Sequence, residues 1–320
     1  MNIVKYNKVF SSKIISLWND EVGFIFPITV EKYNQNINDN KYLNLDLSYV
    51  CIDENNNNIV GFILGKTYDN NPIMPKYYNT SWISLIYVSI KYRKQGIGSK
   101  LLEKFESSLP SNCEKILVGS DIDCFFPGIP NDFDNVGDVF FRNKGYNVNY
   151  YTHDLISSIN NTNTNIINTF NTKYEYRYAT KEDKEKVYDF FERCFYGRWY
   201  YECIEYFENG EIEEEYLIVL DRDKVIGFLR TNKNRISKIS YNIMWRDRFN
   251  NLLGLGPLGV DKEYRNQGIA TNLLLKALEI AKKEGFSNCL IDWTGLLEYY
   301  QKFGFETWKC YQYANKQVEK

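Results

Sequence analysis

The sequence contains very little histidine and no paired cysteine motif. His153 is the one histidine among 320 residues. A Ser-His-Asp site or a histidine-rich metal site therefore lacks the residue on which its chemistry depends. Seven cysteines are scattered along the chain, an odd number without any C-x-x-C spacing. This pattern argues against a zinc site or a disulfide framework, so we expect no bound metal.

The chain also lacks a strong net charge and a long apolar run. Its 39 Lys and Arg residues nearly balance its 41 Asp and Glu residues, which leaves a net charge of −2. The composition therefore predicts neither a nucleic-acid partner nor binding to a membrane. No apolar run approaches the roughly 20 residues that a membrane-spanning helix needs. Residues 1–20 lack the apolar core and cleavage site of a signal peptide, and we expect a cytoplasmic protein.

One short phrase occurs twice in the chain. It reads Tyr92-Arg93-Lys94-Gln95-Gly96-Ile97-Gly98 and again Tyr264-Arg265-Asn266-Gln267-Gly268-Ile269-Ala270. Each copy follows an apolar run ending in valine and leads into an amphipathic helical pattern. A strand, a glycine-bearing turn and a helix start together direct free backbone N–H groups at a phosphate. The same pattern could be an ordinary helix start, but its recurrence in one setting favours a phosphate cradle.

The expected phosphate contacts are backbone N–H groups of the two turns, with an arginine adding positive charge at each rim. In the first copy the binding set is Val88, Arg93, Lys94, Gln95, Gly96, Ile97 and Gly98. In the second copy it is Val260, Arg265, Asn266, Gln267, Gly268, Ile269 and Ala270.

A second glycine-rich stretch, residues 61–67, resembles the Walker A loop of nucleotide hydrolases. That loop has four residues between its glycines, and here Gly61 and Gly65 are separated by three. The stretch also lies inside an expected strand. We therefore do not expect nucleotide hydrolysis.

The order of expected elements repeats on either side of a Ser-, Asn- and Thr-rich segment, residues 155–172, which is typical of a linker. We expect domains at residues 1–154 and 173–320, each a β-α-β-β-β-α-β-α-β unit of the α/β class with a mixed sheet. Strands are expected at Asn2–Tyr6, Leu47–Ile52, Ile59–Thr67, Lys115–Val118, Tyr174–Tyr178, Tyr216–Leu220, Val225–Leu229 and Asn288–Ile291. Thr180 is an N-cap residue type, with Asp183 three residues further on.

Both halves resemble the GCN5-related N-acetyltransferase (GNAT) family. The resemblance lies in the R-x-x-G-x-G/A turn, the V-x-x-x-Y/F element before it, and the closing Tyr300-Gln301-Lys302-Phe303-Gly304-Phe305. It covers nearly the whole chain outside the linker. It implies two tandem domains, each a mixed, mostly antiparallel β-sheet flanked by helices. It also implies acetyl-CoA, or another acyl-CoA, as co-substrate and a small-molecule or peptide amine as acceptor.

The resemblance also assigns catalytic roles. Tyr300 matches the family's tyrosine that protonates the departing thiolate, although a tyrosine packed against the sheet is the alternative. The first half has Phe141 at that place, which cannot donate a proton. Asp292 ends an expected strand and either accepts the amine's proton or caps the following helix. The resemblance implies direct acyl transfer, and we expect the second half to be catalytic and the first half to be a degenerate or regulatory copy that only binds acyl-CoA. The alternative is that the chain is a non-catalytic acyl-CoA sensor or scaffold.

Overall fold

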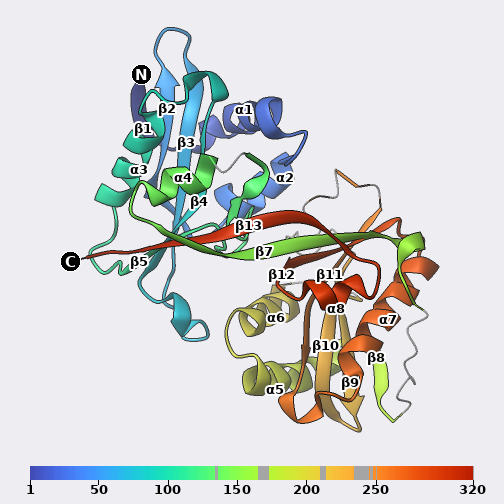
Figure 1. The fold of residues 1–320 in the computed structure, drawn as a ribbon. Coiled ribbons are helices and arrows are strands. Elements are labelled where there is room, and N and C mark those ends of the chain that lie inside the picture. The colour runs from blue at the N-terminus through green and yellow to red at the C-terminus, as the bar shows by residue number, and fades with distance from the viewer. Residues whose placement is uncertain are drawn as a thin grey trace. The chain divides into compact units, whose positions relative to one another are not determined.

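The computed structural model describes residues 1–133, 136–164, 173–209, 214–233, 245, 248–249 and 251–319 (Figure 1). The chain forms two compact units. The first unit comprises Met1–Asn70, Tyr77–Thr152 and Cys310–Lys320, and the second comprises Asn71–Lys76 and His153–Lys309. Within the described residues, no helix is both long and apolar enough to cross a membrane.

The first unit contains a mixed sheet. Its strands are β1 (Asn2–Lys5), β2 (Leu43–Asp53), β3 (Asn58–Thr67), β4 (Thr80–Val88), β5 (Lys115–Val118), β6 (Ile129–Pro130) and part of β13 (Glu306–Gln317). Strands β1 to β4 pair in antiparallel order, β4 pairs with β5 in parallel, and β13 pairs with β5 and β6 in antiparallel. One parallel pair therefore sits within an otherwise antiparallel sheet.

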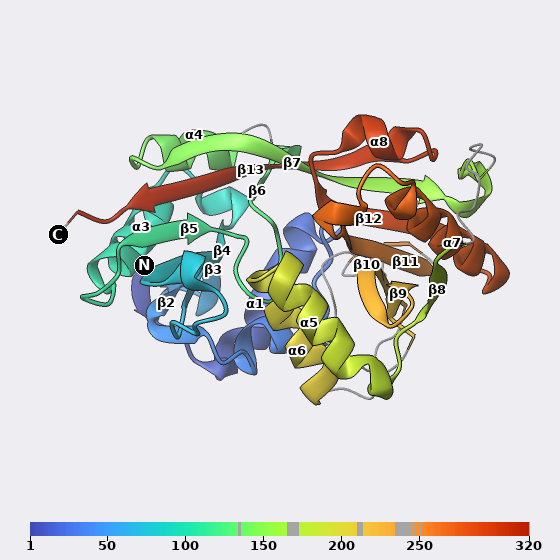
Figure 2. The same ribbon diagram turned by 90° about the horizontal axis from the view of Figure 1, so that it is seen from below.

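Helices cover both faces of this sheet, and Figures 1 and 2 show α1 and α3 on opposite sides of it. The helices of the first unit are α1 (Ser11–Val22), α2 (Val30–Tyr33), α3 (Ile97–Ser107) and α4 (Val136–Arg142). Apolar residues recur along α3 every three or four positions, so Ile97, Leu101 and Phe105 pack into one buried cluster with β2, β3 and β4. This packing fixes the start of α3 next to the end of β4.

The second unit repeats the arrangement. Its strands are β8 (Glu175–Tyr178), β9 (Tyr216–Asp221), β10 (Lys224–Asn232), β11 (Leu252–Val260), β12 (Asn288–Thr294) and part of β7 (Asn147–Ser158). Its helices are α5 (Lys184–Cys194), α6 (Arg198–Asn209), α7 (Ile269–Lys283) and α8 (Leu297–Gln301). Strands β8 to β11 are antiparallel, β11 pairs with β12 in parallel, and β12 pairs with β7 in antiparallel.

The expected fold class is confirmed: each unit is a mixed, mostly antiparallel sheet flanked by helices. The strands expected from sequence are present, with ends that differ by a few residues. The capping box is also present, since the backbone N–H of Thr180 donates to Asp183 Oδ2 at 2.8 Å. The Walker-like residues 61–67 lie inside β3, where they form a strand and no loop.

The final strand of each sheet differs from the expectation. The sequence predicted that each half would keep its own last strand. Instead, residues 153–158 of β7 pair with β12 of the second unit, and residues 314–317 of β13 pair with β5 of the first unit (Figures 1 and 2). Since both halves have the same topology, their sheets offer equivalent edges, and an alternating strand pattern does not specify which edge a strand will join.

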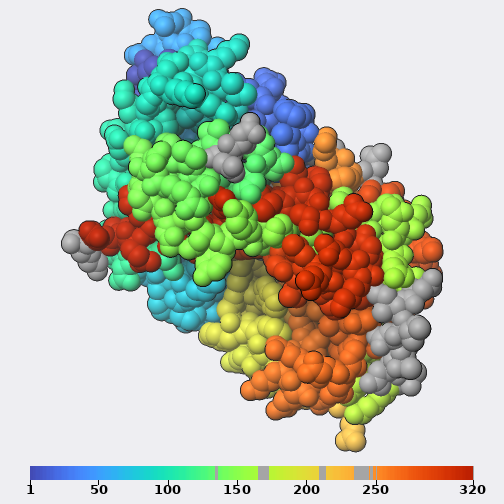
Figure 3. All heavy atoms as spheres, viewed as in Figure 1, coloured from blue at the N-terminus to red at the C-terminus, as the bar shows by residue number. Residues whose placement is uncertain are grey.

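The division of the chain consequently differs from the expected boundaries at 154 and 173. Residues 155–158 of the expected linker belong to β7, and Ile159–Asn161 form a short 3-10 helix. Residues 165–172 lie outside the described residues. At the other end, Figure 3 shows the red C-terminal segment lying against green and blue-green residues of the first unit.

A charged substitution on β13 tests its place in the first unit. Ala314 is fully buried in the cluster that also holds Leu101 and Phe105, so Ala314→Asp should place an unpaired carboxylate there and lower the free energy of unfolding by roughly 3–5 kcal/mol. Gln317→Glu, at an exposed position on the same strand, is the control. Urea denaturation measures both variants. Equal stability of the two variants would contradict the packing of β13 against this core.

Candidate functional site

The two glycine turns have the same backbone geometry. Helix α3 is preceded by Gly96 with φ 81° and Lys94 with φ 60°, and helix α7 is preceded by Gly268 with φ 76° and Asn266 with φ 62°. Two left-handed residues separated by one position fold the chain sharply just before each helix begins. The first N–H groups of each helix, which have no partner within the helix, are thereby left at the turn.

Glycine is favoured at position 96 because of the backbone conformation, and not because a side chain would collide with neighbouring atoms. A Cβ at this position would meet no atom within 4 Å, so the space in front of the turn is open. The positive φ is what disfavours other residues here. The turn therefore leaves room for a ligand at the positive end of the α3 dipole.

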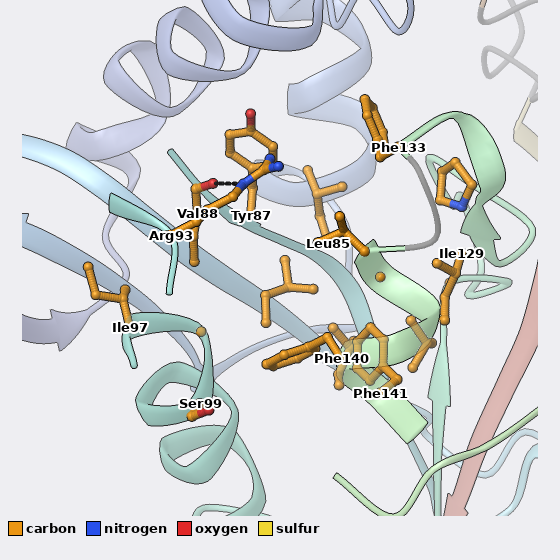
Figure 4. Close-up of a pocket in the computed structure, with 18 of the residues that line it drawn as sticks. Leu85, Tyr87, Val88, Arg93, Ile97, Ser99, Ile129, Phe133, Phe140 and Phe141 are labelled. Carbon is orange, nitrogen blue, oxygen red and sulfur yellow. Dashed lines mark hydrogen bonds between the residues drawn. The ribbon is translucent and has the colours of Figure 1, made fainter. Parts of the chain in front are cut away.

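In each unit, an arginine side chain of the turn donates a hydrogen bond to the strand that precedes it. Arg93 Nε donates to the carbonyl oxygen of Val88 at 3.0 Å (Figure 4), and Arg265 Nε donates to that of Val260 at 3.2 Å. The guanidinium of Arg93 also lies 5.3 Å from the centre of the Tyr87 ring. The two arginines predicted at the rims thus also hold the turns in place.

In each unit, a tyrosine makes a second hydrogen bond that holds the turn, and the sequence analysis did not recognise it. Tyr92 donates its hydroxyl hydrogen to Asp53 Oδ2 at 2.9 Å, and Tyr264 donates to Asp221 Oδ2 at 3.1 Å. Both aspartates end the second strand of their sheets, β2 and β9. The sequence could have pointed to this contact, because both tyrosines belong to the repeated phrase.

A cavity of about 650 Å³ lies beside the first turn. It opens where β4 and β5 separate: their parallel pairing runs from Thr80–Lys115 to Ile83–Val118 and goes no further along β4. Figure 4 shows Leu85 of β4 and Phe140 and Phe141 of α4 around this space. The predicted residues that line it are Val88, Arg93, Lys94, Gly96, Ile97 and Gly98.

Gln95 is the predicted residue of the first turn that does not line the cavity. Its side-chain amide donates to the carbonyl oxygen of Lys91 at 3.3 Å. In the second turn, Gln267 accepts a hydrogen bond from the Tyr174 hydroxyl at 2.9 Å. Both glutamine side chains are therefore hydrogen-bonded to other parts of the protein next to the turns.

Tyr300 lies in α8 and is 7% exposed. Its ring packs edge-on against Tyr299 at 5.0 Å and belongs to the buried cluster beneath α7, as the packing alternative expected. Burial, followed by the neighbouring Tyr299 and Asp292, raises the pKa of Tyr300 well above its usual value. The hydroxyl therefore keeps its proton at neutral pH, and its raised pKa makes it a weaker acid than an exposed tyrosine.

Asp292 lies within β12, and its Oδ2 atom is buried without a hydrogen-bond partner among the described residues. Burial, and then the charge of Asp154, raises the pKa of Asp292 well above that of an ordinary aspartate. Asp292 does not cap the next helix, because the N-cap residue of α8 is Leu296 and no side chain makes a capping hydrogen bond there. The charge of Asp292 in turn contributes to the raised pKa of Tyr300, after burial and Tyr299.

Asp154 is a further polar residue of this region that the sequence analysis missed. It accepts a hydrogen bond from Trp293 N at 3.1 Å, and Trp293 has the left-handed φ of 49°, which is uncommon for a bulky residue. Asp154 belongs to β7, the strand that joins the second unit. No local sequence signal reveals its position, because that position depends on the strand exchange.

No group of three or more His, Cys, Asp or Glu side chains in the described ranges could hold a metal ion. The fold and the turns define a duplicated α/β protein in which a left-handed glycine begins a helix in each unit. The chain belongs to the acetyltransferase (GNAT) family, whose sequence profile matches residues 13–123 and 184–305.

Known proteins share parts of this sequence and fold. An uncharacterized N-acetyltransferase of Methanocaldococcus jannaschii is 29% identical over 150 residues, which is 42% of this chain and 61% of that protein. Among solved structures, the GCN5-related glucosamine N-acetyltransferase region of a fungal multi-domain GH3 beta-N-acetylglucosaminidase superposes with a TM-score of 0.85 and 23% identity, covering 98% of this chain and 38% of that one. A GCN5-related N-acetyltransferase from Sphaerobacter thermophilus gives a TM-score of 0.69 at 12% identity, covering 100% and 96%.

A tandem GNAT protein from the clavulanic acid biosynthesis pathway gives a TM-score of 0.66 at 12% identity, covering 100% of this chain and 99% of that one. These structures show that the duplicated fold as a whole recurs in other proteins.

The raised pKa of Asp292 generates a prediction about stability. A carboxyl whose folded-state pKa lies above its unfolded value destabilises the folded protein progressively as the pH rises above about 4. Asp292→Asn should therefore unfold about 2–4 °C above the wild type at pH 7, with a smaller difference at pH 4. Thermal unfolding followed by circular dichroism measures this.

Asp261→Asn is the matched control. Asp261 is also buried, but Arg193 Nη1 donates to its Oδ2 at 2.9 Å and its pKa is lowered. Its stabilising effect is present above about pH 4 and disappears as the pH falls, so Asp261→Asn should lower the Tm at pH 7. Shifts of the same sign in both variants would contradict the assignment for Asp292.

Proposed function

We propose that the chain is an acyl-CoA-dependent N-acyltransferase that moves an acetyl group from acetyl-CoA to a primary amine by direct transfer. The observation that carries this proposal is the cavity of about 650 Å³ beside the turn that begins α3. It combines an anion-binding helix start with an apolar wall along a separated strand. Those two features suit the pyrophosphate and the pantetheine arm of a coenzyme A thioester.

The residues of the first turn fit this co-substrate. A Cβ at Gly98 would lie 3.4 Å from the Phe140 ring and 3.7 Å from Val88, so alanine fits while a longer side chain would enter the cavity. Lys94 and Arg93 add positive charge beside the helix start. The second copy has Ala270 in place of Gly98, in agreement with this tolerance.

In the second unit, we assign proton transfer to Asp292 and Tyr300. Asp292 would accept the proton that the attacking amine loses, and its raised pKa makes it a stronger base than an ordinary aspartate. Tyr300 would donate its proton to the departing thiolate. Because a thiol has a pKa of about 8.5, the thiolate leaves moderately well unaided, and the contribution of Tyr300 is correspondingly limited.

Glucosamine is the first acceptor to test. The fungal region that shares the fold over 98% of this chain is described as a glucosamine N-acetyltransferase, and a small amine matches the expected acceptor class. The expected cytoplasmic location is part of the same proposal. One observation favours a non-catalytic acyl-CoA sensor instead: Phe141, which cannot donate a proton, lines the first cavity.

Blocking the first turn tests the proposed donor site. Gly98→Glu should place a carboxylate at the helix start, where it repels the pyrophosphate and fills the cavity, so acetyl-CoA binding there should weaken by at least about tenfold. Isothermal titration calorimetry should then show one acetyl-CoA site per chain in place of two. Gly98→Ala should bind as the wild type does. Unchanged stoichiometry in Gly98→Glu would rule out this donor site.

Tyr300→Phe tests the proton donor and is best measured in the Gly98→Glu variant, so that the first turn does not contribute. We expect kcat for acetylation of glucosamine to fall about 10–100-fold with little change in the KM for acetyl-CoA, because the phenolic proton acts only as the C–S bond breaks. Tyr299→Phe, its neighbour in α8, is the control. A loss shared equally by both variants would point to packing as the cause.

A further inference from the structure

A buried ion pair lies next to the cavity of the first unit. Lys66 Nζ is 2.5 Å from Asp121 Oδ2, and both side chains are fully buried. Lys66 also donates to the carbonyl oxygens of Ile122 at 2.8 Å and Asp123 at 3.1 Å. A buried ion pair generally stabilises a fold less than apolar side chains of the same volume, so its presence here is not explained by stability.

Ser84 connects this ion pair to the cavity. Its hydroxyl donates to Asp121 Oδ2 at 2.8 Å, and the residue lines the cavity. In the pairing of β3 with β4, Leu64 faces Leu85 while Gly65 faces Ile83, so Ser84 is the extra residue of a β-bulge. It is also the first residue of β4 beyond the last pair with β5, the point at which the cavity opens.

The hydrogen-bonding state of Ser84 determines what it can bind. A serine hydroxyl has one hydrogen to donate and two lone pairs that can accept. The hydrogen is already donated to Asp121, so towards a ligand the oxygen can act only as an acceptor. Because its partner is a carboxylate, the oxygen becomes a better acceptor than an isolated hydroxyl. A ligand group that donates hydrogen bonds, such as an amine, matches it.

The second unit does not repeat this arrangement. Gly61 pairs with Val88 and Gly227 pairs with Val260, which aligns the two copies. Counting from these pairs, Asn232 takes the place of Lys66 and Gly256 takes the place of Ser84. Asn232 Nδ2 donates to the carbonyl oxygen of Gly256 at 3.1 Å. The first unit therefore has polar groups of its own where the second has an amide and a glycine.

We infer that the first unit is an acyl-transfer site in its own right, in which Ser84 accepts a hydrogen bond from the attacking amine. Asp121 and Lys66 are positioning residues, because they fix the direction of the Ser84 hydroxyl and do not contact the amine. The inference rests on the proposed function, and it replaces the expectation that the first half only binds acyl-CoA.

The reaction at this site does not need an acidic side chain to protonate the leaving thiolate. The amine nitrogen attacks the thioester carbonyl carbon, the C–N bond forms and the C–S bond breaks, and the bonding electrons leave with sulfur as the CoA thiolate. The nitrogen releases its proton to solvent. Phe141 cannot protonate the thiolate, whose pKa of about 8.5 lets it leave as the anion. Holding the amine in line with the carbonyl is then the main contribution of the chain.

The experiment uses the full chain with Ala270→Glu, which blocks the second turn. CoA release from acetyl-CoA is measured with glucosamine, spermidine and a lysine-containing peptide. We expect release to persist in Ala270→Glu. Adding Ser84→Ala should then lower kcat/KM for the amine at least about tenfold while leaving the KM for acetyl-CoA unchanged, since one hydrogen bond to the amine is lost.

Two further variants separate a local role from a loss of folding. Ser81→Ala removes a buried hydroxyl from the same strand outside the cavity and should change neither parameter. Lys66→Met combined with Asp121→Leu removes both charges together, which avoids a lone buried charge and should keep the chain folded. This double variant should lower kcat/KM for the amine by less than Ser84→Ala does, because the Ser84 oxygen remains but its direction is no longer fixed.

The outcomes distinguish this inference from the proposed function. If the wild type acetylates an amine but Ala270→Glu abolishes CoA release, the inference is overturned and the proposed function stands. It is also overturned if Ser84→Ala behaves as Ser81→Ala, or if it raises the KM for acetyl-CoA as much as that for the amine. A wild type that binds acetyl-CoA and acetylates none of the three amines overturns both and favours the sensor.

Discussion

The parallel pairing of β4 with β5 lasts for four residue pairs, and the place where it stops determines the first site. Beyond Ile83 the two strands separate, so one edge of β4 has no neighbouring strand and the cavity occupies the space. The apolar face of α3 keeps the helix start at the end of the same strand. The positive end of the helix, the free edge of β4 and the bulge at Ser84 are thus brought together by one interruption of the sheet.

The turns were predictable because their requirement is local. Gly96 and Gly268 adopt left-handed backbone conformations that glycine tolerates best, so glycine is strongly favoured there. The edge strands and the group around Ser84 were not predictable in this way. Lys66, Ser84 and Asp121 come from three separate strands or loops, and nothing in the spacing of these residues relates one to another. Lys66 resembled part of a phosphate loop, whereas it lies buried in a strand.

The two copies share the hydrogen bonds that hold their glycine turns, but they differ in their buried polar side chains. Arg93 and Arg265 make the same contact with the preceding strand, and Tyr92 and Tyr264 make the same contact with an aspartate. Inside, one unit has an ion pair behind a serine, and the other has Asp292 with a strongly raised pKa near Tyr300. Such a pattern is expected when a duplicated backbone frame is retained while the side chains around it diverge.

The exchanged strand β13 has a consequence for how the protein is made. During synthesis the chain emerges in order, yet the sheet of the first unit is incomplete until residues 314–317 have left the ribosome. All of the second unit precedes those residues, so the second unit can close while β5 still lacks its last neighbour. Domains usually fold in the order of synthesis. Here the earlier half finishes last, and a ribosome that stops anywhere within the second half leaves the first half unfinished as well.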